Sequence, residues 1–384
     1  MNECSRRTFF QMGGAAALGG MALPRGMHGQ EFPPAVPTTQ IYPFDARSPV
    51  SLVKGEDRRK NVTQALLAVD REIGPALKRK KYVAIKVNNV AVDNQLAATH
   101  VDALRGILDY LAPRFKGQVV IVESSQFDSL EGFEYYKYAQ VIPEYKKFNI
   151  KLIDLNREAK YEIFPILDAN VRPIPVRLAA RLFDPDAYII SSAMLKTHDY
   201  VVATMTVKNM TMGAPLHSLA GETPAWHHKR LMHALVAVRQ GARSGAPAAG
   251  RGGAPSSRGA SFHAMNNNLA VVSKKLSTFW GCGLIDGFEG MEGNGPTGGS
   301  AVPMHVALAS PDLVAADRVG LDVMEIPHHA VGYLQYAGEL GIGQFDIAKI
   351  DIRGEKPEAV QRKFKLHDRV QQQLDWLNDV VRQG

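Results

Sequence analysis

The sequence predicts an α/β fold with mostly parallel sheets flanked by helices, in two lobes around a cleft. Short apolar runs rich in β-branched residues alternate with segments of helical periodicity, which is the pattern of βαβ units. Polar residues gather just after several of these runs, where open α/β sheets place their binding crevices. Hydrophobic residues make up 45% of the 384-residue chain, which is enough for a sizeable core.

Each predicted element follows from a local pattern. Short apolar runs predict the strands Tyr82–Val87, Val119–Val122, Leu152–Ile153, Tyr188–Ile190, Phe279–Ile285 and Val302–Leu308. Apolar spacing and capping residues predict the helices: Val62–Ile73 ended by Gly74-Pro75, a helix capped by Thr99, a helix begun by Ser310-Pro311, and a C-terminal helix over 364–384.

The first residues have the features of a twin-arginine export signal. Ser5-Arg6-Arg7-Thr8-Phe9-Phe10 precedes an apolar run rich in small residues, and Gly20-Met21-Ala22 offers a cleavage site. We therefore expect a signal peptide at 1–22, a flexible leader at 23–48, and a periplasmic or otherwise exported protein that the twin-arginine machinery carries. The apolar run is shorter than the ~20 residues of a spanning helix, and no transmembrane span is expected in the mature chain.

Composition narrows the classes of cofactor and partner. Cys4 and Cys282 are the only cysteines, so one chain cannot supply four thiolates to an iron-sulfur cluster. The formal net charge is +7, and part of the basic excess lies in 241–261, a segment of Gly, Ala, Ser, Pro and Arg that we expect to be a disordered insertion. The chain has no recognition motif and no interleaved aromatic and basic stripe, so nucleic acid is not an expected partner.

A first group of polar residues has the chemistry to bind an anion. Lys86 and Asn88 leave the Tyr82 strand, Lys196 follows the Tyr188 strand, and Lys208-Asn209 come shortly after. If these strands are parallel, their ends open at the same edge of the sheet. Lysine is a compact positive charge suited to phosphate or carboxylate, and asparagine both donates and accepts hydrogen bonds. A single residue of this kind is more often solvated, so the prediction depends on the whole set.

A second group offers acid-base or metal-binding chemistry. Its members are His198, Asp286 and Glu292. Imidazole is a common metal ligand and general base, and carboxylates supply oxygen ligands. The two carboxylates lie in a glycine-rich segment, 286–299, whose Gly293 and Gly295 would let the backbone approach a ligand. The segment lacks the spacing of a calcium loop or a phosphate loop, so a plain tight connection is the alternative, and a metal ion is a candidate cofactor only.

The ordered series of these motifs resembles the family catalogued as domain of unknown function 362. In chain order the series is Lys86-x-Asn88, Leu195-Lys196-Thr197-His198, Lys208-Asn209 with Gly213, Asp286-Gly287, Met291 to Pro296, and Ser310-x-Asp312 to Asp317. The resemblance spans roughly Val50 to Met324 and implies an α/β domain of this family, which we place at 49–363. Some members carry a ferredoxin-like part with cysteine-ligated clusters, and this chain lacks those cysteines. The resemblance implies no settled activity.

These expectations combine into one leading hypothesis and two alternatives. In the leading hypothesis the protein is a metal- or cofactor-assisted enzyme, in which Lys196, His198 and Asp286 are catalytic and the other lysines and asparagines bind a small carboxylate or phosphate substrate. The first alternative is a solute-binding, cofactor-binding or maturation protein that uses the same residues without turnover. The second is an electron-transfer partner that uses an external cluster.

Overall fold

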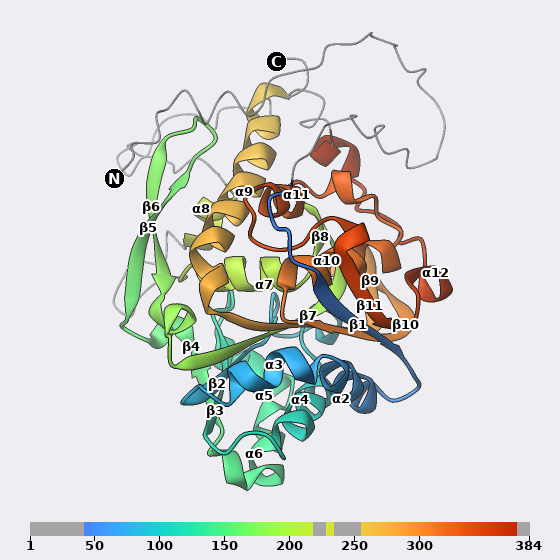
Figure 1. Cartoon of the computed structure of the whole chain (residues 1–384). Helices are drawn as coiled ribbons and strands as arrows, with labels where there is room; N and C mark the ends of the chain where they lie inside the picture. The colour runs from blue at the N-terminus through green and yellow to red at the C-terminus, as the bar shows by residue number, and fades with distance from the viewer. Residues whose placement is uncertain (1–41, 218–227, 234–254, 375–384) are drawn as a thin grey trace.

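The computed structural model describes residues 42–217, 228–233 and 255–374, and its central feature is a sheet of nine strands (Figure 1). The strands are β1 (Ser48–Lys54), β2 (Tyr82–Lys86), β3 (Gln118–Glu123), β4 (Lys151–Asp154), β7 (Ala187–His198), β8 (Val202–Thr204), β9 (Trp280–Asn294), β10 (Gly298–Ser310) and β11 (Ile350–Gly354). Their order is β11-β1-β10-β9-β7-β2-β3-β4, and β8 pairs with β7 outside this path.

Parallel pairing brings several strand ends to the same edge of the sheet. β2 pairs in parallel with β3 and β7, β3 pairs with β4, and β7 pairs with β9. β10 lies antiparallel between β9 and β1, and β1 is parallel to β11. The predicted α/β class with mostly parallel strands is confirmed. The strands form one continuous sheet, however, where two lobes around a cleft were expected.

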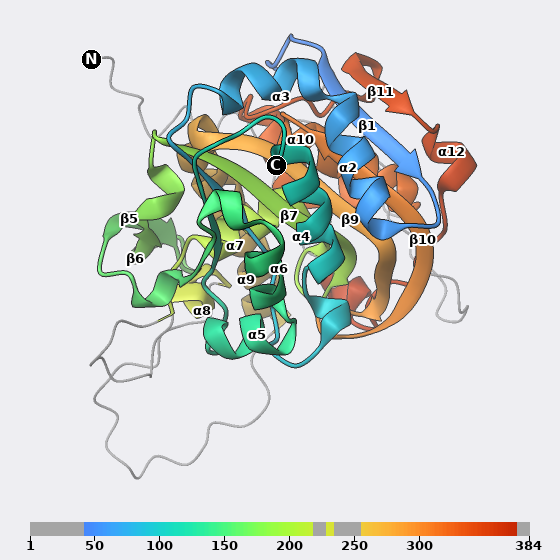
Figure 2. The same cartoon turned by 90° about the horizontal axis from the view of Figure 1, so that it is seen from below.

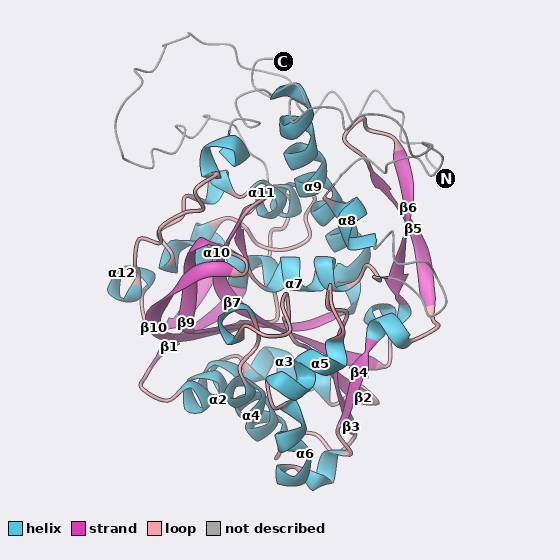
Figure 3. Ribbon diagram, turned by 180° about the vertical axis from the view of Figure 1, so that it is seen from behind, coloured by secondary structure: helices cyan, strands magenta, loops and turns pink. Residues whose placement is uncertain are grey.

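Helices cover both faces of this sheet, as Figures 2 and 3 show. One face carries α2 (Arg58–Ala68), α3 (Asp70–Leu77), α4 (Val101–Leu111), α5 (Ser129–Tyr135) and α6 (Val141–Glu144). The other carries α7 (Thr206–Gly213), α8 (His228–Met232), α9 (Pro255–Leu276), α10 (Leu313–Val323) and α11 (Gly332–Glu339). Alternate strand residues point to opposite faces, so Ala84 packs in the core layer of the second face while Val83 and Ile85 pack in that of the first. The hairpin of β5 (Tyr161–Leu167) and β6 (Pro173–Ala179) flanks the second face, and α12 (Pro357–Val360) follows β11.

Two strands extend well beyond their predicted ends, which changes how the candidate site is built. β7 continues to His198, so Lys196 and His198 lie within a strand and not after one. β9 and β10 form a long hairpin, so most of the expected glycine loop at 286–299 is strand. Its glycines serve close packing, because a Cβ at Gly287 would lie 2.8 Å from Leu195 Cδ1 and one at Gly295 would overlap the carbonyl oxygen of Thr197.

Several predicted helix ends are wrong by a few residues. Gly74-Pro75 lies inside α3, where the proline removes a single backbone donor and the helix continues to Leu77. The cap of α4 is His100, whose Nδ1 accepts from Asp102 N, because the hydroxyl of Thr99 is engaged elsewhere. The cap of α10 is Asp312 and not Ser310.

Several predicted segments lie wholly or partly outside the described residues. The predicted signal peptide and most of the leader fall there, as do residues 241–254 of the predicted insertion and residues 375–384 of the C-terminal helix. Residues 255–261 of that insertion belong to α9, and helix in the C-terminal segment begins at residue 370, because 361–367 are non-helical. Among the helices that the structure describes, none combines the length and apolar character needed to cross a bilayer.

Candidate functional site

Four lysine side chains are buried at the carboxyl ends of β2 and β7 and around α7. Lys86 and Lys196 are each 1% exposed, Lys208 is 7% exposed and Lys229 is 9% exposed. Burial, together with the charges of Lys86 and Lys208, lowers the pKa of Lys196 and of Lys229 to about 7. Lysines are rarely buried unless they are paired, so four in one place point to a specialised region. We call these residues the lysine cluster.

Lys86 is the member of the lysine cluster with a carboxylate partner. Its Nζ lies 2.6 Å from Glu123 Oε1 and also donates to Val87 O at 2.7 Å and to Asn209 Oδ1 at 3.2 Å. Burial still lowers the pKa of Lys86, although the negative charge of Glu123 opposes this effect. Gly213 at the end of α7 makes room for this side chain, because a Cβ there would overlap Lys86 Cε.

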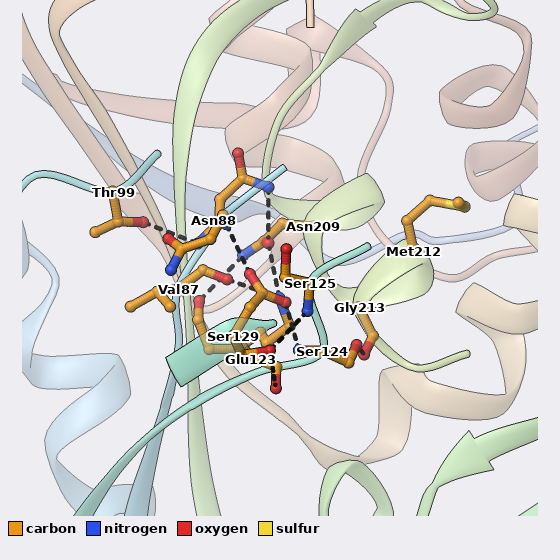
Figure 4. Close-up of polar contacts among 12 residues, drawn as sticks. Val87, Asn88, Thr99, Glu123, Ser124, Ser125, Ser129, Asn209, Met212 and Gly213 are labelled. Atoms are coloured by element: carbon orange, nitrogen blue, oxygen red, sulfur yellow. Dashed lines mark hydrogen bonds and ion pairs between the residues drawn. The ribbon is translucent and has the colours of Figure 1, made fainter. Parts of the chain in front are cut away.

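Two asparagines connect the strand ends to α7 (Figure 4). Asn88 Nδ2 donates to Asn209 Oδ1 at 3.2 Å, and Asn209 Nδ2 donates to Lys86 O and Ser191 Oγ, each at 3.1 Å. Asn88 Oδ1 accepts a short hydrogen bond from Lys196 Nζ. The predicted residues Lys86, Asn88, Lys196 and Asn209 therefore form one hydrogen-bonded network.

A threonine that was predicted to be a helix cap holds this network in place. Thr99 Oγ1 accepts from Asn88 N at 2.9 Å and donates to Ser192 O at 3.0 Å (Figure 4). It thereby joins the chain leaving β2 to strand β7. Glu123 is fixed in the same way, because its two carboxylate oxygens accept from Asn89 N and Ser124 N, each at 2.7 Å.

Lys208 differs from the other lysines in what surrounds its amine. No hydrogen-bond acceptor or ion-pair partner of Lys208 Nζ lies in the part of the chain that the structure describes. Burial lowers its pKa to about 8, and the more distant charge of Asp199 only partly offsets this. An amine that has no protein partner, in a region with several other lysines, can contact an anion directly.

Helix α7, which carries Lys208 and Asn209, is fixed at both of its ends. At the amino end, Asp317 accepts from Thr206 N at 2.8 Å and Val207 N at 2.9 Å. At the carboxyl end, Lys229 donates to Met212 O, to Pro215 O at 2.8 Å and to Ser124 Oγ at 2.9 Å. A carboxylate at the start and an ammonium at the end both complement the helix dipole.

Lys229 is the member of the lysine cluster that the sequence analysis missed. It directly follows His227 and His228 in the sequence, and a lysine in a polar segment of this kind is normally solvated. Only the packing of α8 beside the end of α7 shows that this side chain is buried.

Two histidines adjoin the lysine cluster in their neutral form. His198 is buried, and its Nδ1 accepts from Tyr200 N at 3.0 Å and lies 3.3 Å from Asp199 Oδ1. Burial holds the pKa of His198 well below its usual range, and the charge of Lys208 adds to this effect. Burial also lowers the pKa of His233 to about 4. Both imidazoles are therefore uncharged at neutral pH.

The C-terminal segment lies along the strand ends next to His198. Gln373 donates from Nε2 to His198 O at 3.0 Å and accepts from Val202 N at 2.7 Å, which ties this segment to the β7 and β8 hairpin. Arg369 pairs with Asp199 at 3.2 Å.

The two predicted carboxylates are engaged by other partners. Asp286 is buried on β9 with its Oδ2 3.3 Å from Arg58 Nε of α2, and burial raises its pKa. Glu292 accepts from Lys365 N at 2.8 Å, and Gly293 N donates to Lys365 O.

These carboxylates do not form a metal site with His198. Within residues 42–217, 228–233 and 255–374, no group of three or more His, Cys, Asp or Glu side chains is placed to hold a metal ion. Gly293 and Gly295 also have structural explanations: Gly293 has a φ of +76°, which favours glycine, and a Cβ at Gly295 would overlap the carbonyl oxygen of Thr197.

Comparison with known proteins gives the family and no activity. None of the curated proteins compared with the chain matches it significantly. A crystal structure of a Thermotoga maritima protein, a structural-genomics target, is similar at 9% identity and a TM-score of 0.37, and the similarity covers 75% of this chain and 60% of that one. This chain thus spans less than two thirds of that protein. Residues 83–322, which include all four members of the lysine cluster, match the family described as Domain of unknown function (DUF362), and the chain belongs to this family.

Proposed function

We propose that the protein is an enzyme that binds a small anion, a carboxylate or a phosphate, in the lysine cluster. The observation that carries this proposal is Lys208, whose side chain is 7% exposed and whose amine has no acceptor among the described residues. Four lysines stand against one directly paired carboxylate, Glu123, so the positive charge is in excess. An anion in contact with Lys208 would supply the missing partner and raise the lowered pKa values of its neighbours.

The support for catalysis comes from Lys196. Burial brings its pKa to about 7, so at neutral pH this amine can both accept and donate a proton. A group of this kind beside an anion-binding cation is suited to act on the bound molecule. A metal ion is not part of the proposal, because His198, Asp286 and Glu292 do not converge.

Calorimetric titration of the full chain with inorganic phosphate and with acetate tests the anion site. We expect Lys208→Met to weaken binding at least about tenfold, since hydrogen bonds to charged groups contribute about 1.5–3 kcal/mol. Lys60→Met is the matched control, because the Lys60 side chain is 80% exposed. Binding should also take up protons near pH 8, as lysines with lowered pKa values become charged. Equal affinity of the Lys208 variant and the wild type would contradict the proposal.

We also propose that the protein is exported by the twin-arginine route. The support is the Arg6-Arg7 pair ahead of a short apolar run. Replacing both arginines with lysine should leave the protein in the cytoplasm, which fractionation of cells would show. Continued translocation of that variant would contradict the assignment.

A further inference from the structure

The hydrogen-bond acceptors of Lys196 are neutral oxygens, with no carboxylate among them. Its Nζ donates to two neutral oxygens, Asn88 Oδ1 and Ala97 O, the latter at 3.0 Å. An ammonium has three N–H donors, whereas a neutral amine has two donors and a lone pair. No third acceptor and no paired carboxylate of Lys196 lies in the described ranges, so no counter-charge holds this amine in its ammonium form.

The charges around Lys196 favour its neutral form. Lys86 and Lys208 place positive charge close enough to lower the pKa of Lys196, and the amine is 1% exposed. Burial and neighbouring cations are two of the ways in which a lysine becomes a nucleophile toward carbonyl carbon. In Lys208 the same neighbourhood provides a cation without a partner, which could hold the anionic end of a carbonyl compound.

We propose that Lys196 forms an imine with the carbonyl group of a small anionic substrate, such as a 2-oxo acid or a phosphorylated aldehyde, whose anionic group contacts Lys208. This inference rests on the proposed anion site and names the substrate class for it. Asn88 acts as a positioning residue, because its Oδ1 orients the amine. His198 and Lys86 have no covalent part in this step.

The step needs no oxidant, reductant or metal. The lone pair of Lys196 Nζ attacks the carbonyl carbon, a C–N bond forms, and the π electrons of the carbonyl move to oxygen, which takes one amine proton. The hydroxyl then leaves as water with the second amine proton while the C=N bond forms. One water molecule is released for each imine formed.

Reductive trapping tests this proposal on the full chain. The wild type is incubated at pH 7 with sodium cyanoborohydride and either pyruvate or glycolaldehyde phosphate, and the adduct is located by peptide mass spectrometry. We expect one adduct, on Lys196, that inorganic phosphate suppresses. The two probes distinguish a carboxylate substrate from a phosphate substrate, and trapping of either supports the proposal. Labelling that follows the exposure of surface lysines, or no adduct with either probe, overturns it.

Trapping measured in variants and at several pH values distinguishes the imine from the anion site on which it depends. Lys196→Arg should abolish trapping, Lys208→Met should raise the probe concentration needed at least tenfold, and the control Lys60→Met should change neither. In the wild type, the trapping rate should level off above pH 7 to 8, whereas an exposed lysine would continue to gain reactivity toward pH 10. Retained phosphate binding without trapping would refute the imine alone. If the wild type shows neither trapping nor phosphate binding, the anion site is refuted as well. Because mapping uses the wild type, the result holds even if a variant fails to fold.

Discussion

Replacing Lys208 with methionine should stabilise the ligand-free protein while it removes anion binding. Burial lowers the pKa of this lysine from 10.5 to about 8. At about 1.4 kcal/mol per pKa unit, holding the buried charge costs the folded state about 3 kcal/mol at pH 7. Methionine is of similar length and carries no charge, so Lys208→Met should recover much of that free energy of unfolding.

The pH dependence of this difference follows from the sign of the shift. Below pH 8 the lysine is protonated in both the folded and the unfolded protein, so the full cost is present. Between pH 8 and 10.5 the folded protein releases the proton first, and the wild type gains stability relative to the variant. The advantage of Lys208→Met should therefore shrink through this window and vanish above it.

Urea unfolding in buffer without phosphate or sulfate measures this advantage at pH 7 and pH 9.5, with Lys60→Met as the control. Inorganic phosphate at a hundredfold excess over its Kd should then stabilise the wild type by about 2.7 kcal/mol and the Lys208 variant far less. A variant that is less stable than the wild type at pH 7 would refute the reasoning. So would a difference that stays constant between the two pH values.

Three further substitutions test the contacts around the lysine cluster. Glu123→Gln leaves the ammonium of Lys86 buried without the carboxylate that lies 2.6 Å away. We therefore expect the free energy of unfolding, measured with urea at pH 7, to fall by about 3–5 kcal/mol. An unchanged unfolding midpoint would show that the pair is dispensable. Gly213→Ala should destabilise the protein by about 1–3 kcal/mol and weaken phosphate binding, because the added Cβ displaces the Lys86 side chain. Alanine favours helix more than glycine does, so a stabilised variant would argue against this overlap. Gln373→Leu should lower the free energy of unfolding by about 2 kcal/mol and speed amide exchange in the β7 and β8 hairpin. The same change at the exposed Gln372 should do neither. Equal exchange in both variants would contradict the role of the Gln373 side chain.

Much of the candidate site could be predicted because strand ends are visible in the sequence. Lys86 and Asn88 directly follow a buried apolar run, and parallel strands place their carboxyl ends at one edge. The structure joins both residues to Lys196 and Asn209 through hydrogen bonds. The prediction for Asp286 was different in kind, since it depended on a glycine-rich segment being a loop, and that segment is paired strand.

The sequence by itself determined the α/β class, most of the strands and the polar residues that follow them, because apolar periodicity and capping are local properties of the chain. The single continuous sheet and the long β9 and β10 hairpin depended on pairing between distant strands, which no local pattern encodes. Tertiary packing likewise decided that Lys208 and Lys229 are buried and that Glu292 contacts the C-terminal segment. Burial is a property of the assembled layers, because it depends on which distant segments pack over a side chain, and here it gathers the four lysines and lowers their pKa values.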